Sequence, residues 1–199
     1  MVVKFNVRDW REIIKTCGAV TATCPSEREV CRYIDLLFMG NECVAYGSNC
    51  SQVTKTCVPC VNVDIPWMYH LLVLPEKIPP RTHCVELFVD PKAKEYMIVY
   101  SDTEDDEIDG HTVPFFEGDP PDYDAMFKDA HKHLDSFDFG YGKYHIMVNP
   151  NILMNALEGM KSFDRVVLKF GDMAHPFTIS PEWDSSAIEA LVYPGIQNG

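Results

Sequence analysis

The chain has 199 residues, of which 46% are apolar or aromatic and 24% are charged. This globular composition excludes a disordered or collagen-like protein, and the length allows one large domain or two small ones. Seventeen basic residues against 30 acidic ones give a formal net charge of −13, which excludes a protein that holds nucleic acid mainly through a basic surface.

The first sixty residues predict a β-α-β-β-β unit. Residues 2–7 are typical of a short strand, and residues 8–20 of a helix. Three further strands are expected over residues 33–39, 43–47 and 52–58, because turn-forming residues separate them.

The predicted helix has two distinct faces. One is an apolar stripe with the spacing i, i+3, i+4, i+7, made of Trp10, Ile13, Ile14 and Cys17. A second face carries the basic residues Arg8, Arg11 and Lys15. At 100° per residue this face is centred about 140° from the apolar stripe. The helix therefore has a core side and a positively charged side.

The middle of the chain is less regular. Residues 70–74, 84–89 and 96–100 are expected to be strands, and residues 122–137 a helix. Pro75–Arg81 occupies the place where a repeat of the first unit would have its helix, but three prolines in seven residues forbid more than a turn. This segment is either a degenerate third unit or an insertion.

The acidity of the chain is local. Between Asp102 and Asp124 there are ten acidic residues and no Lys or Arg, so the other residues carry twenty acids and seventeen bases, a net charge of −3. The run fails the EF-hand calcium pattern, because Glu107 and Val113 stand where Gly and Glu are needed. We expect residues 102–124 to be a solvated or partner-facing loop.

The C-terminal sixty residues repeat the pattern of the first unit. Residues 143–148 read as a strand, Asn149-Pro150 as a helix start, and residues 165–170, 176–180 and 188–193 as three strands. Two copies of one unit indicate an internal pseudo-repeat. The predicted organisation is a first unit over 1–62, a degenerate unit or insertion over 63–139, and a C-terminal unit over 140–199.

The cysteines and histidines allow two alternatives to be weighed. Cys57-Val-Pro-Cys60 has the spacing of a zinc knuckle that Cys43 and Cys50 could complete, but no second C-x-x-C occurs, and buried apolar thiols are the favoured interpretation. His131 and His133 point about 200° apart on a helix and cannot share a ligand. No hydrolase, P-loop, dinucleotide or zincin motif is present, so we expect no enzyme, no cofactor and no metal.

The N-terminus carries Lys4, Arg8 and Asp9 where a signal peptide would have an apolar run, and no stretch has the roughly 20 apolar residues of a membrane span. We therefore expect a cytoplasmic protein with reduced cysteines.

Several segments in order resemble the bacterial-type DNA sliding clamps (the DNA polymerase III beta subunit, or processivity factor, family). NPNILMNALEGM, RVVLKFGDMAHPFTI and ALVYPGI are similar to that family's last strand-to-helix entry, the strand pair after it, and its terminal strand and tail. VKFNVRDWREIIKTCGAV resembles its opening strand and helix. Ile108-Asp109-Gly110 and Pro121-Asp122-Tyr123 resemble a segment that the family carries in its middle.

The resemblance implies an α+β DNA-clamp fold built from repeated β-α-β-β-β units, with helices on the inner face and antiparallel sheets outside. It implies a non-enzymatic ring that encircles double-stranded DNA and tethers a DNA polymerase, with a clamp loader as a further partner. The implied DNA-facing residues are Arg8, Arg11, Lys15 and Lys161. The implied partner pocket comprises His175, Pro176, Leu191, Val192, Tyr193, Pro194, Gly195 and Ile196.

Rings of this family close from about twelve units, so three units per chain predict a homotetramer and two predict a hexamer; we favour the tetramer. The short chain favours a phage-type clamp, acting in the host cytoplasm. The alternatives are a clamp-fold interaction protein or DNA mimic that uses its acidic stretch without encircling DNA, and a zinc-stabilised module.

Overall fold

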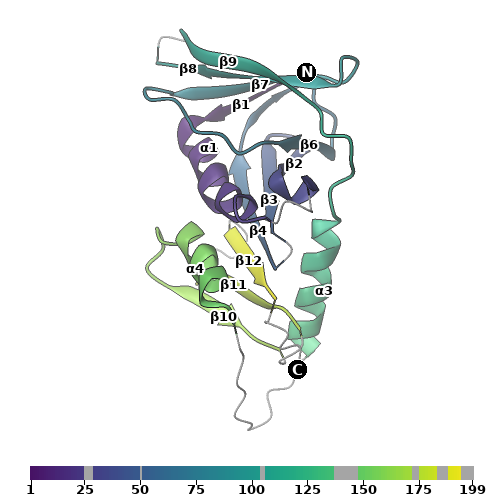
Figure 1. Cartoon of the computed structure of the whole chain (residues 1–199), viewed down its shortest axis with the longest axis vertical. Coiled ribbons are helices and arrows are strands. Elements are labelled where there is room, and N and C mark those ends of the chain that lie inside the picture. The colour runs from purple at the N-terminus through teal and green to yellow at the C-terminus, as the bar shows by residue number, and fades with distance from the viewer. Residues whose placement is uncertain are drawn as a thin grey trace.

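The computed structural model describes residues 1–24, 29–49, 51–103, 106–136, 148–171, 175–182 and 188–193. In this part of the chain, two antiparallel sheets and the helices packed on them form an α+β fold (Figure 1). The predicted fold class is therefore confirmed. The strand predicted over 143–148 lies almost wholly outside the described residues.

The first sheet has five strands in the order β5-β1-β7-β8-β9, every neighbouring pair antiparallel. Its members are β5 (Val61–Val63), β1 (Val2–Asn6), β7 (Cys84–Asp90), β8 (Glu95–Ser101) and β9 (Glu107–Pro114).

The second sheet has seven strands in the order β10-β11-β12-β4-β3-β2-β6, again antiparallel throughout. Its members are β10 (Val166–Lys169), β11 (Phe177–Pro181), β12 (Ile188–Val192), β4 (Gln52–Pro59), β3 (Glu42–Ser48), β2 (Ile34–Met39) and β6 (Tyr69–Val73). Strands β4 and β12 join the N-terminal and C-terminal parts of the chain into one sheet.

In the first half of the chain, two consecutive sets of four strands each place their first strand in the other set's sheet. Strand β1 precedes β2-β3-β4 in the chain but pairs with β7, whereas β6 precedes β7-β8-β9 but pairs with β2. The two sets of strands therefore follow the same plan. No helix lies between β6 and β7, as the prolines of Pro75–Arg81 predict, and Thr82 closes this segment by donating to the carbonyl of Pro79 at 2.9 Å.

The first helical segment begins at α1 (Val7–Ile13), where the Asn6 side chain accepts from the Arg8 amide, and ends with α2 (Ala19–Thr21). Between them Ile14–Gly18 is π-helical, a widening that the apolar spacing did not predict. Trp10, Ile13 and Cys17 are buried in the core between the two sheets, as expected.

Two longer helices lie on opposite faces of the seven-stranded sheet. Helix α4 (Pro150–Gly159) begins at Asn149, whose side chain accepts from the Asn151 amide, and lies on the same side as α1, whereas α3 (Tyr123–Ser136) runs along the other side (Figure 1). Strand β2 serves both faces, because Leu36 packs in the core beneath α1 and Leu37 packs beneath α3. None of the described helices is long and apolar enough to cross a membrane.

The prediction of one loop over residues 102–124 is wrong for its centre. Glu107–Pro114 form strand β9, which pairs with β8. Its acidic residues Glu107 and Asp109 remain exposed, and within the described residues β9 is paired on one side only. An edge strand can carry charges that a central strand could not, and charged edges also discourage aggregation.

Candidate functional site

The π-helical segment is attached directly to the seven-stranded sheet. The Thr54 hydroxyl donates to the Thr16 carbonyl at 3.2 Å, and the Cys17 thiol donates to the Ala45 carbonyl at 3.3 Å. A π turn displaces carbonyls from the usual helical bonding pattern, and these side-chain donors lie within reach of it. At Gly47 the strand approaches so closely that a Cβ would lie 2.4 Å from the Cys17 carbonyl oxygen. This attachment fixes the orientation of the whole helical segment.

The opposite side of the same segment carries the predicted basic face. Arg8 and Arg11 are exposed, whereas Lys15, inside the π turn, is half-buried. None of the three forms an ion pair with another described residue. Their positive charges are therefore available to an external anion. Glu12 borders this face and accepts a hydrogen bond from Thr16 at 3.2 Å.

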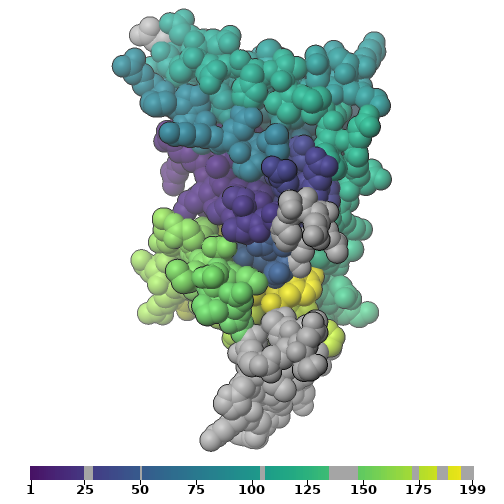
Figure 2. Space-filling view, viewed as in Figure 1, coloured from purple at the N-terminus to yellow at the C-terminus, as the bar shows by residue number. Residues whose placement is uncertain are grey.

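Helix α4 lies beside this segment on the same side of the sheet. A Cβ built on Gly159 would lie 3.5 Å from the Thr16 Cα, an ordinary contact distance. The buried Gln52 amide holds α4 to β4, its nitrogen donating to the Ile152 carbonyl and its oxygen accepting from the Ala156 amide, each at 3.2 Å. Figure 2 shows the N-terminal helical segment in purple directly above α4 in green. The two helices thus form one continuous surface.

The fourth predicted DNA-facing residue differs from the first three. Lys161 is exposed just beyond the end of α4, but its ammonium group pairs with the carboxylate of Glu158. Glu158 and Asn151 are exposed on α4 itself, so this helix adds little positive charge to the surface. Of the four predicted DNA-facing residues, the three without an ion pair to a described residue therefore lie on α1 and the π turn.

Helix α3 covers part of the predicted partner pocket, which the sequence did not indicate. Leu191 is fully buried against Phe127 and Ala130 of α3, and the half-buried Tyr193 packs against the same cluster. The exposed His175 ring stacks on His133 of α3, with 3.8 Å between ring centroids. His131 forms a hydrogen bond with Glu189 of β12 instead. His131 and His133 therefore have different neighbours, as predicted.

The remaining pocket residues divide between other surroundings. Val192 is buried in a separate cluster with Met160 beneath α4, and Pro176 is half-buried. Pro194, Gly195 and Ile196 lie outside the described residues. The structure therefore brings Leu191, Tyr193 and His175 together against α3, and it places Val192 on the opposite face of β12.

A polar cluster around one buried carboxylate fastens α3 to the sheet. The Glu189 carboxylate, 3% exposed, lies 3.0 Å from the Lys55 ammonium and 2.9 Å from Nε2 of His131. The Lys55 ammonium also sits 4.6 Å above the centre of the Phe127 ring. At the other end of the helix, the Tyr46 hydroxyl donates to Asp124 at 2.5 Å. Helix α3 is therefore held by polar contacts near both ends.

The described cysteines of the possible zinc knuckle are Cys43, Cys57 and Cys60, and two of them are buried in the apolar core. Cys43 and Cys60 are buried with the core between the sheets, whereas Cys57 pairs with Val44 in the neighbouring register position and belongs to the other face of β4. Burial raises the pKa of Cys60 to about 11 and that of Cys43 well above its ordinary value. Protonated thiols bind zinc poorly. Cys50 lies outside the described residues, and among those described no group of metal-ligating side chains could hold an ion.

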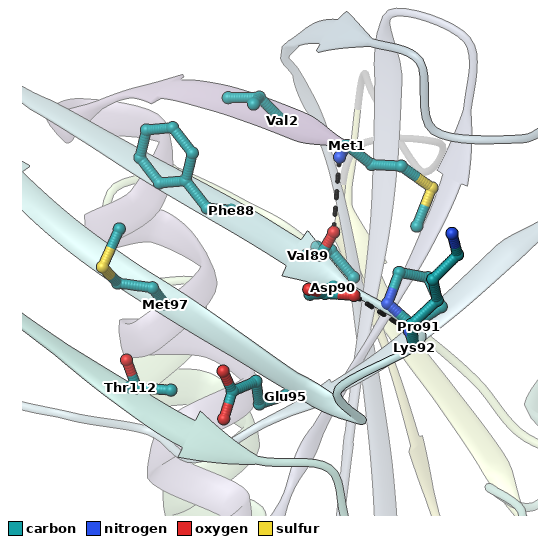
Figure 3. Close-up of a pocket in the computed structure, with 10 residues that line it drawn as sticks. All are labelled: Met1, Val2, Phe88, Val89, Asp90, Pro91, Lys92, Glu95, Met97 and Thr112. Carbon is teal, nitrogen blue, oxygen red and sulfur yellow. Dashed lines mark hydrogen bonds between the residues drawn. The ribbon is translucent and has the colours of Figure 1, made fainter.

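A surface cavity of about 600 Å³ lies on the five-stranded sheet, away from all these residues. Figure 3 shows Val2, Phe88 and Met97 side by side on its floor, while Asp90 and Lys92 stand at its rim. None of the predicted site residues is among the described residues that line it.

No family model and no curated protein matches the chain in sequence. Its structure does match solved ones. The beta chain of DNA polymerase III from Streptococcus pneumoniae superposes with a TM-score of 0.71 at 11% identity, over 97% of this chain and 64% of that one.

The fold is that of a DNA sliding clamp. The beta subunit from Thermotoga maritima gives a TM-score of 0.64 at 12% identity, covering 98% of this chain and 66% of its own. The DNA polymerase sliding clamp from Bacillus subtilis gives 0.63 at 12% identity, covering 98% and 64%. This chain thus spans about two thirds of the length of the clamps it matches.

Proposed function

We propose that the chain is a DNA sliding clamp: a non-enzymatic ring of several copies that encircles duplex DNA and tethers a DNA polymerase. The observation that carries the proposal is the basic face of α1, which lies on one side of a clamp-fold sheet and is available to an external anion. A ring holds DNA by its topology and needs only a modest positive lining. The net charge of −13 is compatible with this, because ten of the acids lie in the 102–124 stretch.

The arrangement of strands supports three units in each chain. Strands β6 to β9 follow the plan of β1 to β4, with the proline segment in place of a helix. We therefore assign residues 1–62, 63–139 and 140–199 to a first unit, a unit without its helix, and a C-terminal unit. Twelve units in a ring would then require four chains. The joint between β4 and β12 provides the model for contacts between units: antiparallel pairing of edge strands.

Arg8, Arg11 and Lys15 are proposed to line the hole and contact DNA phosphates, with Lys161 at the margin because Glu158 already neutralises it. The proposed partner site remains at the C-terminal strand, where His175 and Tyr193 lie beside α3. A polymerase peptide would bind next to α3 or displace it, because Leu191 is otherwise inaccessible.

The test measures how much protein is retained on linear DNA whose two ends can be blocked. The protein is mixed with linear duplex DNA carrying biotin at both ends, streptavidin is added to block the ends, and bound protein is measured by gel filtration in 0.3 M salt. Replacement of Arg8, Arg11 and Lys15 by Ala should reduce retention at least fivefold. The matched control replaces Lys92, Lys128 and Lys132, which are exposed outside the proposed lining, and should leave retention unchanged.

Equal retention of the two triple variants over a range of salt concentrations would show that the basic face of the helix does not contact DNA. The alternative function, a clamp-fold protein that occupies the basic site of a replication protein, is favoured by one feature: the exposed acids of β9. Failure of the wild-type chain to remain on blocked DNA, together with binding to a basic partner, would favour that alternative.

A further inference from the structure

The loop between β5 and β6, residues 64–68, is fixed at both ends. Ile65 is buried, its amide bonds to the Asn62 side chain at 2.9 Å, and the Asn62 amide group returns a bond to the Ile65 carbonyl at 3.1 Å. At the other end the Met68 amide donates to the Phe38 carbonyl at 2.9 Å. The loop therefore holds its side chains in place before any partner arrives.

This fixed loop displays two large apolar side chains to solvent. Trp67 is 68% exposed and Met68 is 51% exposed. The Trp67 ring lies along the turn at Gly40, where a Cβ would lie 3.4 Å from it. Trp and Met are enriched at the centres of protein interfaces, and a rigid loop reduces the entropy lost on binding. A solitary exposed Leu would need no explanation, but an ordered Trp-Met pair is typical of a contact site.

An acidic cavity of about 310 Å³ adjoins the loop, with Met68 in its wall. Among the described residues that line it, three are carboxylates and none is Lys or Arg; His70 also lines it. The carboxylates belong to Asp35, Asp122 and Asp124. Asp35 is almost fully buried beside His70, and Asp124 accepts from Tyr46. The cavity thus combines apolar walls with negative charge.

The raised pKa of Asp35 is consistent with this excess of negative charge in the cavity. Burial raises the pKa of this carboxyl above its ordinary value, and the charge of Asp124 adds to the rise although His70 opposes it. A positive group placed in the cavity would relieve part of this unfavourable field.

We propose that Trp67, Met68 and the adjoining acidic cavity form a docking surface for an extended segment of a partner protein that carries a Lys or Arg next to an apolar residue. The apolar residue packs on the Trp67 ring, and the basic side chain enters the cavity. Nucleic acid is excluded as the occupant, because phosphates would face three carboxylates. The surface is separate from the C-terminal strand, and the proposal does not depend on the clamp function.

The test is selection of a phage-displayed library of random twelve-residue peptides on the immobilised full chain. Selected peptides should share a Lys or Arg within two positions of an aromatic or aliphatic residue, and they should bind in solution. Trp67→Ala should weaken a selected peptide at least tenfold, and the pair Asp122→Asn and Asp124→Asn at least fivefold. Asn can still cap α3 and accept from Tyr46, so these variants remove charge with little change of shape.

The matched control combines Met154→Ala and Glu117→Gln, a well-exposed apolar residue and an exposed acid elsewhere. It should leave the peptide affinity unchanged. Thermal unfolding of each variant verifies that the fold is retained. The proposal is overturned if the selection yields no peptide whose binding depends on Trp67, or if the enriched peptides are acidic, or if the control weakens them as much as Trp67→Ala.

Discussion

The Thr54 hydroxyl on β4 donates a hydrogen bond to the carbonyl oxygen of Thr16, 3.2 Å away in the π turn. Both residues are buried, so neither group can turn to water instead. Together with the thiol of Cys17, this bond ties the helical segment to the sheet and fixes the direction in which Arg8 and Arg11 project. The basic surface therefore depends on a short buried contact on its opposite side.

Gly47→Ala should destabilise the fold by about 3 kcal/mol, because the new methyl group would overlap the backbone of Cys17, at 2.4 Å from its carbonyl oxygen. Urea unfolding followed by circular dichroism measures the loss. Gly159→Ala is the matched control, since its Cβ would make only ordinary contacts with Thr16. Equal effects of the two substitutions would contradict the close approach at Gly47.

Asp35→Asn should make the free energy of unfolding less dependent on pH. Folding raises the pKa of Asp35, mainly by burial, so the folded state resists its ionisation. The cost is absent below the ordinary carboxyl pKa of about 4 and fully present above the folded-state pKa. The wild-type chain should therefore lose stability relative to the variant as pH rises through this window. Urea titrations from pH 4 to pH 8 measure the difference; parallel curves would refute the prediction.

Lys55→Met should cost about 3 kcal/mol, because it removes the ammonium group beside the buried Glu189 carboxylate and leaves His131 as the one remaining hydrogen-bond partner of that carboxylate among the described residues. Glu189→Gln should cost less, about 1 kcal/mol, since the amide can still bond to both neighbours. Chemical denaturation compares the two. A larger loss of stability for Glu189→Gln would contradict this, because it would show that the Lys55–Glu189 attraction, and not the cost of an unpaired buried carboxylate, determines the effect.

The periodicity of the sequence predicted most strands and the three main helices, because apolar spacing records which face is buried. It failed at β9, where the half-exposed edge strand has acidic residues on both faces and no long apolar alternation. The π turn at Ile14–Gly18 could not be predicted either, since it depends on the approach of β3 and β4.

The sequence also did not predict which part of the sheet each helix packs against. The apolar residues of α3 indicated a helix, but its contact with Leu191 and Tyr193 joins positions more than sixty residues apart. The basic face of α1, in contrast, could be read directly, because a single helix determines it. Local patterns therefore predicted the exposed basic face of α1, but they did not predict that α3 covers Leu191.

The proposed ring predicts a defined oligomer in solution. Light scattering at micromolar concentration without DNA should give a molar mass about four times the 22.7 kDa of one chain. Six chains would indicate that the middle segment does not count as a unit. A mass of 22.7 kDa would mean that no stable ring forms by itself.

Release from DNA after cutting tests the central claim most directly. Wild-type protein is retained on end-blocked duplex DNA in 0.3 M salt, and a restriction enzyme then cleaves the DNA at one internal site. A ring that slides should leave through the new ends, so that most of the protein is lost within minutes while an uncut sample keeps it. Equal retention on cut and uncut DNA, or no retention on either, would contradict a clamp that encircles its DNA.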